Sequence, residues 1–177
     1  MKKLTITNIE MLNIVEWYNN MDKDSKDALP VKTYYALKRA IAAMMGEYKN
    51  VTDVRDDKNK QLREKYFSEE MSEPCVIPKL DDNGEPILDE NGAQITEEGR
   101  RVKKEYEQEF RDEQQKMNEE FAEVLAEKNT YTYNTIDFEA MIEKLPDDSK
   151  IKNSDLDIIE ALLSQDEEPE DEKKDEK

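Results

Sequence analysis

Adjacent carboxylates are the commonest side chains in this chain that could do acid–base chemistry. They form three pairs: Asp56 and Asp57, Glu69 and Glu70, and Asp147 and Asp148. A carboxyl group that works as a general acid must be shielded from water and must have a raised pKa. Neighbouring acids within strongly charged sequence meet neither condition. The pairs therefore predict solvated surface, and we assign none of them a catalytic role.

Two acidic segments resemble ion-binding loops. Residues 81–84 and 89–92 read DDNG and DENG, the one internal repeat that we find. An EF-hand loop needs an oxygen ligand five residues before its glycine, and those positions hold Lys79 and Ile87. Asn-Gly is, however, a strong signal for a tight turn. The repeat therefore predicts two turns, and we assign no metal ligand and no cofactor.

The sequence has few side chains that could support nucleophilic catalysis. The chain has no histidine and a single cysteine, Cys75. Histidine-dependent triads and histidine-containing zinc sites are excluded, and one cysteine cannot form an internal disulfide. Cys75 lies between Pro74 and Val76 with no histidine to activate it, so we interpret it as an idle or buried thiol. We accordingly expect a protein that is not an enzyme, with no catalytic or cofactor-binding residues.

The charge of the chain favours a protein partner. Acidic residues outnumber basic ones by 45 to 27, and the net charge is −18. Residues 1–66 carry +3 and residues 67–96 carry −7. Such acidity repels nucleic acid and anionic membranes except at a local basic patch. The basic stretches 55–65 and 100–104 are interpreted as solvated helix faces or as partners of acidic residues on the other helix. No segment reaches the roughly 18 apolar residues of a membrane span.

Two long segments predict helices. Residues 33–67 carry apolar residues in two heptad phases and contain no proline, and residues 97–128 carry them at spacings of three and four. Each apolar stripe needs a partner, and two helices of similar length can fold back on one another. We therefore predict a long antiparallel helical hairpin of coiled-coil type. Its arms are residues 33–67 and 97–128.

The insert between the arms predicts a small β tip. Residues 74–96 contain the two Asn-Gly turns, and Pro78 and Pro86 restrict the strands to sheet edges. The apolar pair Ile87 and Leu88 lies between the turns. We select Ile87 and Leu88 as the candidate partner-binding residues of the tip.

The two ends of the chain predict a small α+β base, formed by residues 1–30 and 129–165. KLTIT (3–7) and TYTYNTIDF (130–138) have strand character, and we expect them to pair. Thr7 and Glu10 form a capping-box signature before a helix that reaches Met21. Shorter helices are expected at 138–145, before Pro146, and at 154–163. We expect a mainly α, single elongated domain over 1–165, followed by a disordered acidic tail at 166–177.

The order of these signals resembles a known family. LTITNIEMLNIV is followed by LPVKTYYALKRAI and later by an Asp-Glu-Asn-Gly turn at Asp89–Gly92. This order is similar to that of a family of small uncharacterised proteins from tailed phages and prophages of Gram-positive bacteria. The resemblance covers roughly residues 4–160. It implies a phage origin and action in the host bacterial cytoplasm or in a virion.

Two functions remain open on these observations. The first is a non-enzymatic interaction or assembly protein that presents the hairpin and its tip to a phage or host protein, with a homo-oligomer also possible. The alternative is an acidic inhibitor that occupies the nucleic-acid-binding surface of a host protein, as an anti-defence protein would. Neither function needs direct contact with nucleic acid or membrane.

Overall fold

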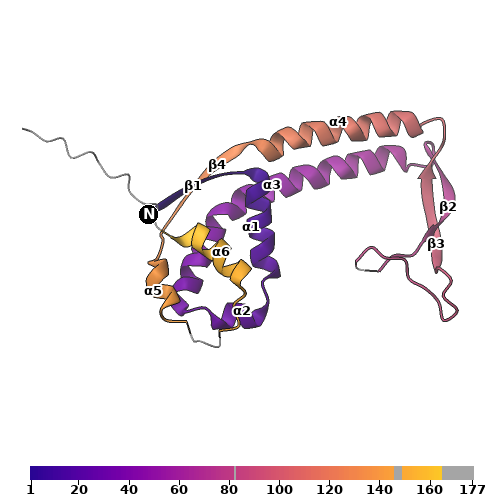
Figure 1. Cartoon of the computed structure of the whole chain (residues 1–177). Helices are drawn as coiled ribbons and strands as arrows, with labels where there is room; N and C mark the ends of the chain where they lie inside the picture. The colour runs from indigo at the N-terminus through magenta and orange to yellow at the C-terminus, as the bar shows by residue number, and fades with distance from the viewer. Residues whose placement is uncertain (82, 146–148, 165–177) are drawn as a thin grey trace, which may run out of the picture. The chain divides into compact units, whose positions relative to one another are not determined.

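Helices make up most of the described chain, and the prediction of a mainly α protein is confirmed. The structure, a computed structural model, describes residues 1–81, 83–145 and 149–164 (Figure 1). The predicted tail at 166–177 and Pro146 lie outside these residues. The elements, in chain order, are β1 Lys2–Thr7, α1 Asn8–Asn20, α2 Lys23–Ala28, α3 Val31–Tyr66, β2 Ser72–Pro78, β3 Thr96–Val102, α4 Glu107–Ala126, β4 Lys128–Tyr133, α5 Phe138–Ile142 and α6 Asn153–Leu163.

The chain divides into two compact units. Unit 1 consists of Met1–Thr52 together with the chain from Val124 onward, and unit 2 is Asp53–Glu123. Both boundaries fall inside helices, one in α3 and one in α4. Unit 1 contains the β1–β4 sheet, and unit 2 contains the β2–β3 sheet.

The predicted pairing of the chain's two strand segments in unit 1 is confirmed. β1 and β4 are antiparallel, in a register that runs from Lys2 opposite Tyr133 to Thr7 opposite Lys128. The hydroxyls of Thr5 and Thr130 share a hydrogen bond of 2.8 Å across the pair. The second strand ends at Tyr133. The β1–β4 ladder therefore joins two segments far apart in sequence.

The capping box predicted before α1 is also confirmed. The Glu10 backbone N–H donates to the Thr7 hydroxyl, and the Thr7 backbone N–H donates to the Glu10 carboxylate at 2.8 Å. This backbone hydrogen bond from Thr7 is the main reason that the pKa of Glu10 lies below its ordinary value. The box fixes the point at which β1 turns into α1.

Asn8 connects α1 with the chain that enters β4. Its side chain is fully buried, and its Nδ2 donates to the Val124 carbonyl at 2.8 Å. Its Oδ1 accepts from Asn129 Nδ2 at 2.9 Å, while its backbone N–H donates to the Glu127 carbonyl. A buried polar side chain is tolerated here because its polar groups are paired.

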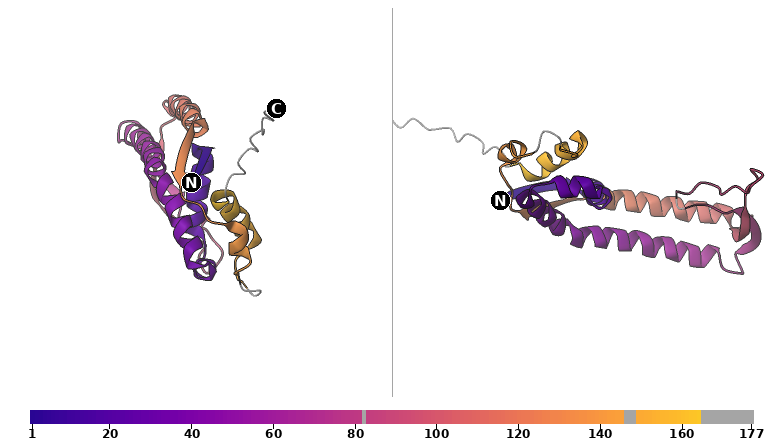
Figure 2. Two further views of the ribbon diagram at one scale, coloured as in Figure 1. Left: turned by 90° about the vertical axis from the view of Figure 1, so that its left-hand side faces the viewer. Right: turned by 90° about the horizontal axis from the view of Figure 1, so that it is seen from below.

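The core of unit 1 is built mainly from α1, α3 and α6. Its fully buried apolar side chains are Met11, Val15, Leu37, Ala40, Met44, Ile159 and Leu163. Trp17 of α1 donates to Asp155 of α6 at 2.9 Å, and the ribbons of these helices lie near each other (Figures 1 and 2). Lys2 donates to the carbonyls of Ala161 and Ser164 at the end of α6.

One helix in unit 1 was not predicted. Residues 23–28 form α2, although their sequence, KDSKDA, has no apolar stripe. The helix is set by its N-cap, because Asp22 accepts hydrogen bonds from the backbone N–H and the hydroxyl of Ser25. Such a cap can define a short polar helix that hydrophobic periodicity does not reveal.

The predicted helix over 97–128 was wrong in its first part. Residues 96–102 form β3, and α4 begins only at Glu107. The sequence TEEGRRV contains Gly99, which is unfavourable in a helix, and its backbone pairs with that of β2 from Thr96 opposite Pro78 to Val102 opposite Ser72. The pairing of β3 with a distant segment decides its conformation.

Candidate functional site

The tip of unit 2 is a three-way β junction. Lys79 N–H donates to Ile95 O at 2.8 Å, Ile95 N–H donates to Ile87 O at 2.8 Å, and Ile87 N–H donates to Lys79 O at 2.9 Å. These three backbone hydrogen bonds form a closed ring. Three arms leave the ring: the β2–β3 ladder, a lobe over 80–86 and a lobe over 88–94. Both lobes are visible beyond the β2–β3 ladder in Figure 1.

The two lobes repeat the same local structure. An isolated bridge closes each lobe, Leu80 opposite Pro86 in the first and Leu88 opposite Gln94 in the second. Each lobe turns at a glycine with positive φ, 81° at Gly84 and 80° at Gly92. A side chain is disfavoured at this φ, which explains the glycine. The predicted Asn-Gly turns are therefore confirmed.

An aspartate organises each lobe. Asp81 Oδ1 accepts from the backbone N–H groups of Asn83 at 2.8 Å and Glu85 at 2.9 Å. Asp89 Oδ1 accepts from the equivalent N–H groups, Asn91 at 2.8 Å and Ala93 at 2.9 Å. The first acid of each repeat therefore binds backbone N–H groups of its own turn. Within the described residues, no group of three or more metal-binding side chains is found.

Titration of Asp81 provides a test of this lobe. The N–H groups of Glu85 and then Asn83 hold the pKa of the Asp81 carboxyl below its ordinary value of 3.8. A lowered folded-state pKa means that the carboxylate stabilises the lobe above the unfolded pKa, and that this stabilisation is lost as the pH falls through the folded pKa. We expect the carboxyl carbon of Asp81, followed by NMR, to titrate below pH 3.8 together with the amide signals of Asn83 and Glu85.

Asp81→Asn is the matched control for that titration, because asparagine still offers an oxygen to the turn but cannot ionise. The acid-induced shifts of the two amides should disappear in this variant. Titration of Asp81 at its ordinary pKa in the unaltered chain would contradict the hydrogen bonding described here.

The strand alternation gives the tip two faces. Residues that pair directly share a face, as do residues two apart along a strand. The register therefore places Val76, Leu80 and Leu88 on one face, which we call the apolar face. Their exposed fractions are 70%, 53% and 55%. The other face carries Ile77, Ile87 and Ile95, of which Ile87 is half-buried.

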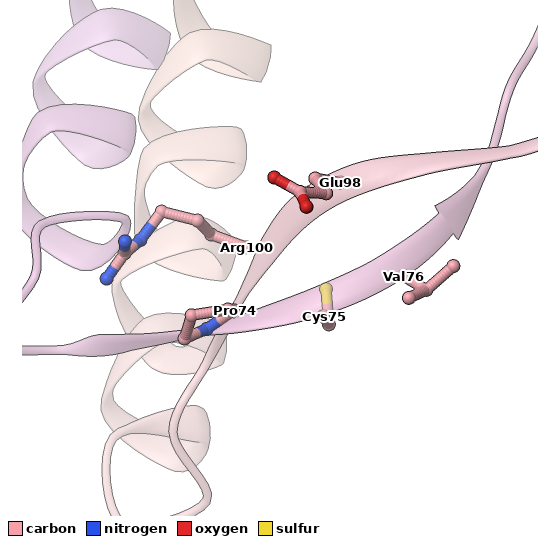
Figure 3. Close-up of a pocket in the computed structure, with 6 residues that line it drawn as sticks. Pro74, Cys75, Val76, Glu98 and Arg100 are labelled. Carbon is pink, nitrogen blue, oxygen red and sulfur yellow. The ribbon is translucent and has the colours of Figure 1, made fainter.

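A surface hollow adjoins the apolar face on the β2–β3 ladder. Six residues line it: Pro74, Cys75, Val76, Glu98, Gly99 and Arg100. Arg100 points back toward the helices (Figure 3) and donates from Nε to Ser72 Oγ at 2.7 Å and from Nη2 to Ser72 O at 3.1 Å. The Cys75 thiol is half-buried and forms no disulfide. Pro74, Val76 and Glu98 are the exposed residues among the six that line this hollow.

The ends of α3 and α4 that lead to the tip meet in an aromatic and ionic cluster. Tyr66 is fully buried, and its ring packs edge-on against Phe110 with 5.1 Å between centroids. Its hydroxyl donates to Glu109 at 3.0 Å. Lys65 pairs with Glu109 at 2.9 Å and with Glu113 at 2.5 Å. These contacts fix the end of α3 against the start of α4.

The cluster shifts the pKa values of its members. Hydrogen bonds to Glu113, Glu109 and Tyr66 raise the pKa of Lys65, and the Lys65 hydrogen bond lowers that of Glu109. Desolvation by burial raises the pKa of Tyr66. All three groups therefore keep their usual protonation states near neutral pH, which suits a structural role.

The structure places the two predicted tip residues differently. Ile87 belongs to the hydrogen-bonded ring and is half-buried, whereas Leu88 begins the second lobe and is exposed on the apolar face. Leu80 was not selected from the sequence, although it occupies the same position in the first repeat as Leu88 does in the second. Aligning KLDDNGEP with ILDENGAQ would have identified it.

Comparisons with models of protein families, with curated proteins and with solved structures gave no match. Among the described residues, no helix is both long and apolar enough to cross a membrane.

Proposed function

We propose that this chain is a non-enzymatic protein-interaction or assembly module whose β tip binds a protein partner. The observation that carries the proposal is the apolar face, on which Val76, Leu80 and Leu88 are each more than half exposed on a hydrogen-bonded frame. Exposed apolar clusters with polar rims are typical of protein interaction sites. Glu98 pairs directly with Val76 and adds an exposed carboxylate to the same face, so the preferred partner presents apolar side chains beside a basic one.

The proposal includes the finer architecture of the helices. We propose that α3 and α4 form an antiparallel hairpin with coiled-coil-like packing that carries the tip. Within unit 2 this is supported by the Lys65 ion pairs with α4 and by the neighbouring ribbons of the two helices (Figures 1 and 2). A rigid support lowers the entropy lost when the tip binds.

We also propose a tailed-phage or prophage origin, with action in the host bacterial cytoplasm or in a virion. The support is the order of sequence motifs set out above. The partner is then a phage or host protein. An acidic inhibitor of a host nucleic-acid-binding protein is the competing function, and the net charge of −18 favours it.

Substitutions on the apolar face test the proposal. The partner is first captured from phage-infected cells, and its affinity for the purified chain is then measured by calorimetry. We expect Leu88→Ala and Leu80→Ala each to weaken binding by at least about 1 kcal/mol, as truncation of a buried interface anchor does. Ile87→Ala is expected to weaken binding less than either leucine substitution, because Ile87 is half-buried and lies on the other face of the tip.

The matched control is Val31→Ala, since Val31 is 85% exposed and lies outside the tip. Its affinity should equal that of the unaltered chain. The dependence of affinity on salt concentration distinguishes the two functions. Exposed charges are screened beyond roughly 10 Å at 0.1 M salt, so an inhibitor that binds through its acidic surface would lose affinity as salt is added. Steep loss of affinity with salt, competition by DNA and no effect of the leucine substitutions would favour the inhibitor and contradict binding through the apolar face.

A further inference from the structure

A second surface of unit 2 lies between its two helices. A groove there is lined by Lys58, Gln61, Leu62 and Lys65 of α3 and by Glu113, Lys116, Met117 and Glu120 of α4. The groove lies on the helices and not on the tip. Its two walls differ in charge. The α3 wall carries two basic residues, Lys58 and Lys65, and the α4 wall carries two acidic residues, Glu113 and Glu120, with one basic residue, Lys116.

The helices that form this groove bury very little. No described residue of α4 is buried, and none is buried in α3 from Asp53 to Lys65. Leu62, Phe110, Met117 and Phe121 are only half-buried. Helices of this length gain most of their stability from packing an apolar stripe against a neighbour. The stripe is therefore incompletely covered in a single chain.

The charges along the groove form a lysine row on α3 and a glutamate row on α4, with Lys116 of α4 between the two glutamates. Lys58 and Lys65 are one heptad apart on α3, and Glu113 and Glu120 are one heptad apart on α4. The ion pair of Lys65 with Glu113 sets these two residues at the same level. One heptad further along the groove, the antiparallel course of the helices brings Lys58 and Glu120 to a common level.

We propose that a second copy of this chain covers the groove, with a two-fold axis parallel to the helices. This symmetry places α3 of each copy on α4 of the other and keeps every residue at its own level. Lys58 of one copy then faces Glu120 of the other, and Leu62 and Met117 meet in the centre. The product is a four-helix arrangement in unit 2.

The charge rows select this arrangement over the other two-fold packing. An axis perpendicular to the helices would place α3 on α3 and α4 on α4. The lysine row of α3 would then face its own copy, which is unfavourable because no acidic residue of α3 lines the groove. The parallel axis also places both tips at the same end of the four helices. A dimer would thus offer two apolar faces to a partner.

The proposal is tested by the mass of the full chain in solution, measured by light scattering and sedimentation equilibrium up to about 1 mM. We expect a dimer. Lys58→Glu and Glu120→Lys should each raise the dissociation constant roughly tenfold, since each replaces two attractive contacts by repulsive ones. Lys60→Glu is the matched control on the same helix and should leave the constant unchanged, because Lys60 does not line the groove.

A mixing experiment then separates contacts between copies from contacts within one copy. In an equimolar mixture of the Lys58→Glu and Glu120→Lys variants, both contacts between copies regain opposite charges. Dimers should return to the affinity of the unaltered chain, with far-UV circular dichroism showing that each variant keeps its helices. A monomer at all concentrations, a dimer insensitive to both variants, or failure of the mixture to recover would each overturn the proposal.

Discussion

Replacing Tyr66 by alanine is expected to lower the free energy of unfolding of unit 2 by about 3–5 kcal/mol, the usual range for truncating a buried aromatic side chain. Tyr66 is the fully buried aromatic residue at the end of α3, and it packs against Phe110. The surrounding helices bury little else, so no other contact compensates. Hydrogen exchange of the backbone amides in 53–66 and 107–117 measures the loss directly, because it reports local opening.

Two variants separate the ring of Tyr66 from its hydroxyl. Tyr66→Phe keeps the packing and removes the hydrogen bond to Glu109, so we expect a smaller loss of about 1–2 kcal/mol. Phe67→Ala should also cost less than Tyr66→Ala, because Phe67 is 38% exposed. Unchanged amide protection in Tyr66→Ala would mean that the ends of α3 and α4 are held together by other contacts.

Replacing Leu37 by alanine is expected to lower the free energy of unfolding of unit 1 by about 2–5 kcal/mol. Leu37 is fully buried in the first half of α3, and truncation leaves a cavity among well-packed side chains. Chemical denaturation followed by the fluorescence of Trp17 measures the effect, since this residue also lies in unit 1.

Tyr35→Ala is the control for Leu37→Ala, because Tyr35 is 62% exposed on the same helix. Its effect should stay within about 0.5 kcal/mol. Equal losses in the two variants would contradict a specific contribution of the buried Leu37 side chain, because alanine is the stronger helix former at both positions.

Local signals in the sequence were sufficient to predict several helices. The capping box needs only Thr7 and Glu10, and the start of α1 was predicted correctly from them. The long proline-free heptad pattern likewise gave α3 to within two residues at each end. Capping and periodicity act over a few residues, so they can be detected without knowledge of the tertiary structure.

Two elements, β3 and α2, were missed for different reasons. β3 has only weak strand character, and its conformation follows from pairing with β2, as between Gly99 and Cys75. Its charged residues were therefore assigned to the following helix. The prediction missed α2 for a different reason. Its N-cap at Asp22 is a local signal, but its residues have no apolar stripe from which a helix could be recognised.

The candidate site was only partly predictable. The Asn-Gly turns were evident from the sequence because glycine tolerates positive φ. The closed ring joins the backbones of Lys79, Ile87 and Ile95 through N–H and carbonyl groups that every residue except proline carries. A ring of backbone hydrogen bonds leaves no requirement on side-chain type, so the sequence could not separate the half-buried Ile87 from the exposed Leu88.

The same ring has a consequence for how the tip can evolve. Each lobe begins and ends at two ring residues that are hydrogen-bonded to each other. Insertions at Asn83–Gly84 or Asn91–Gly92 therefore do not displace the ring or the β2–β3 ladder. Lengthening a loop costs little, because closure entropy grows only slowly with length. Lineages of this protein can therefore diversify either lobe independently, exchanging one recognition loop for another while the framework is inherited unchanged.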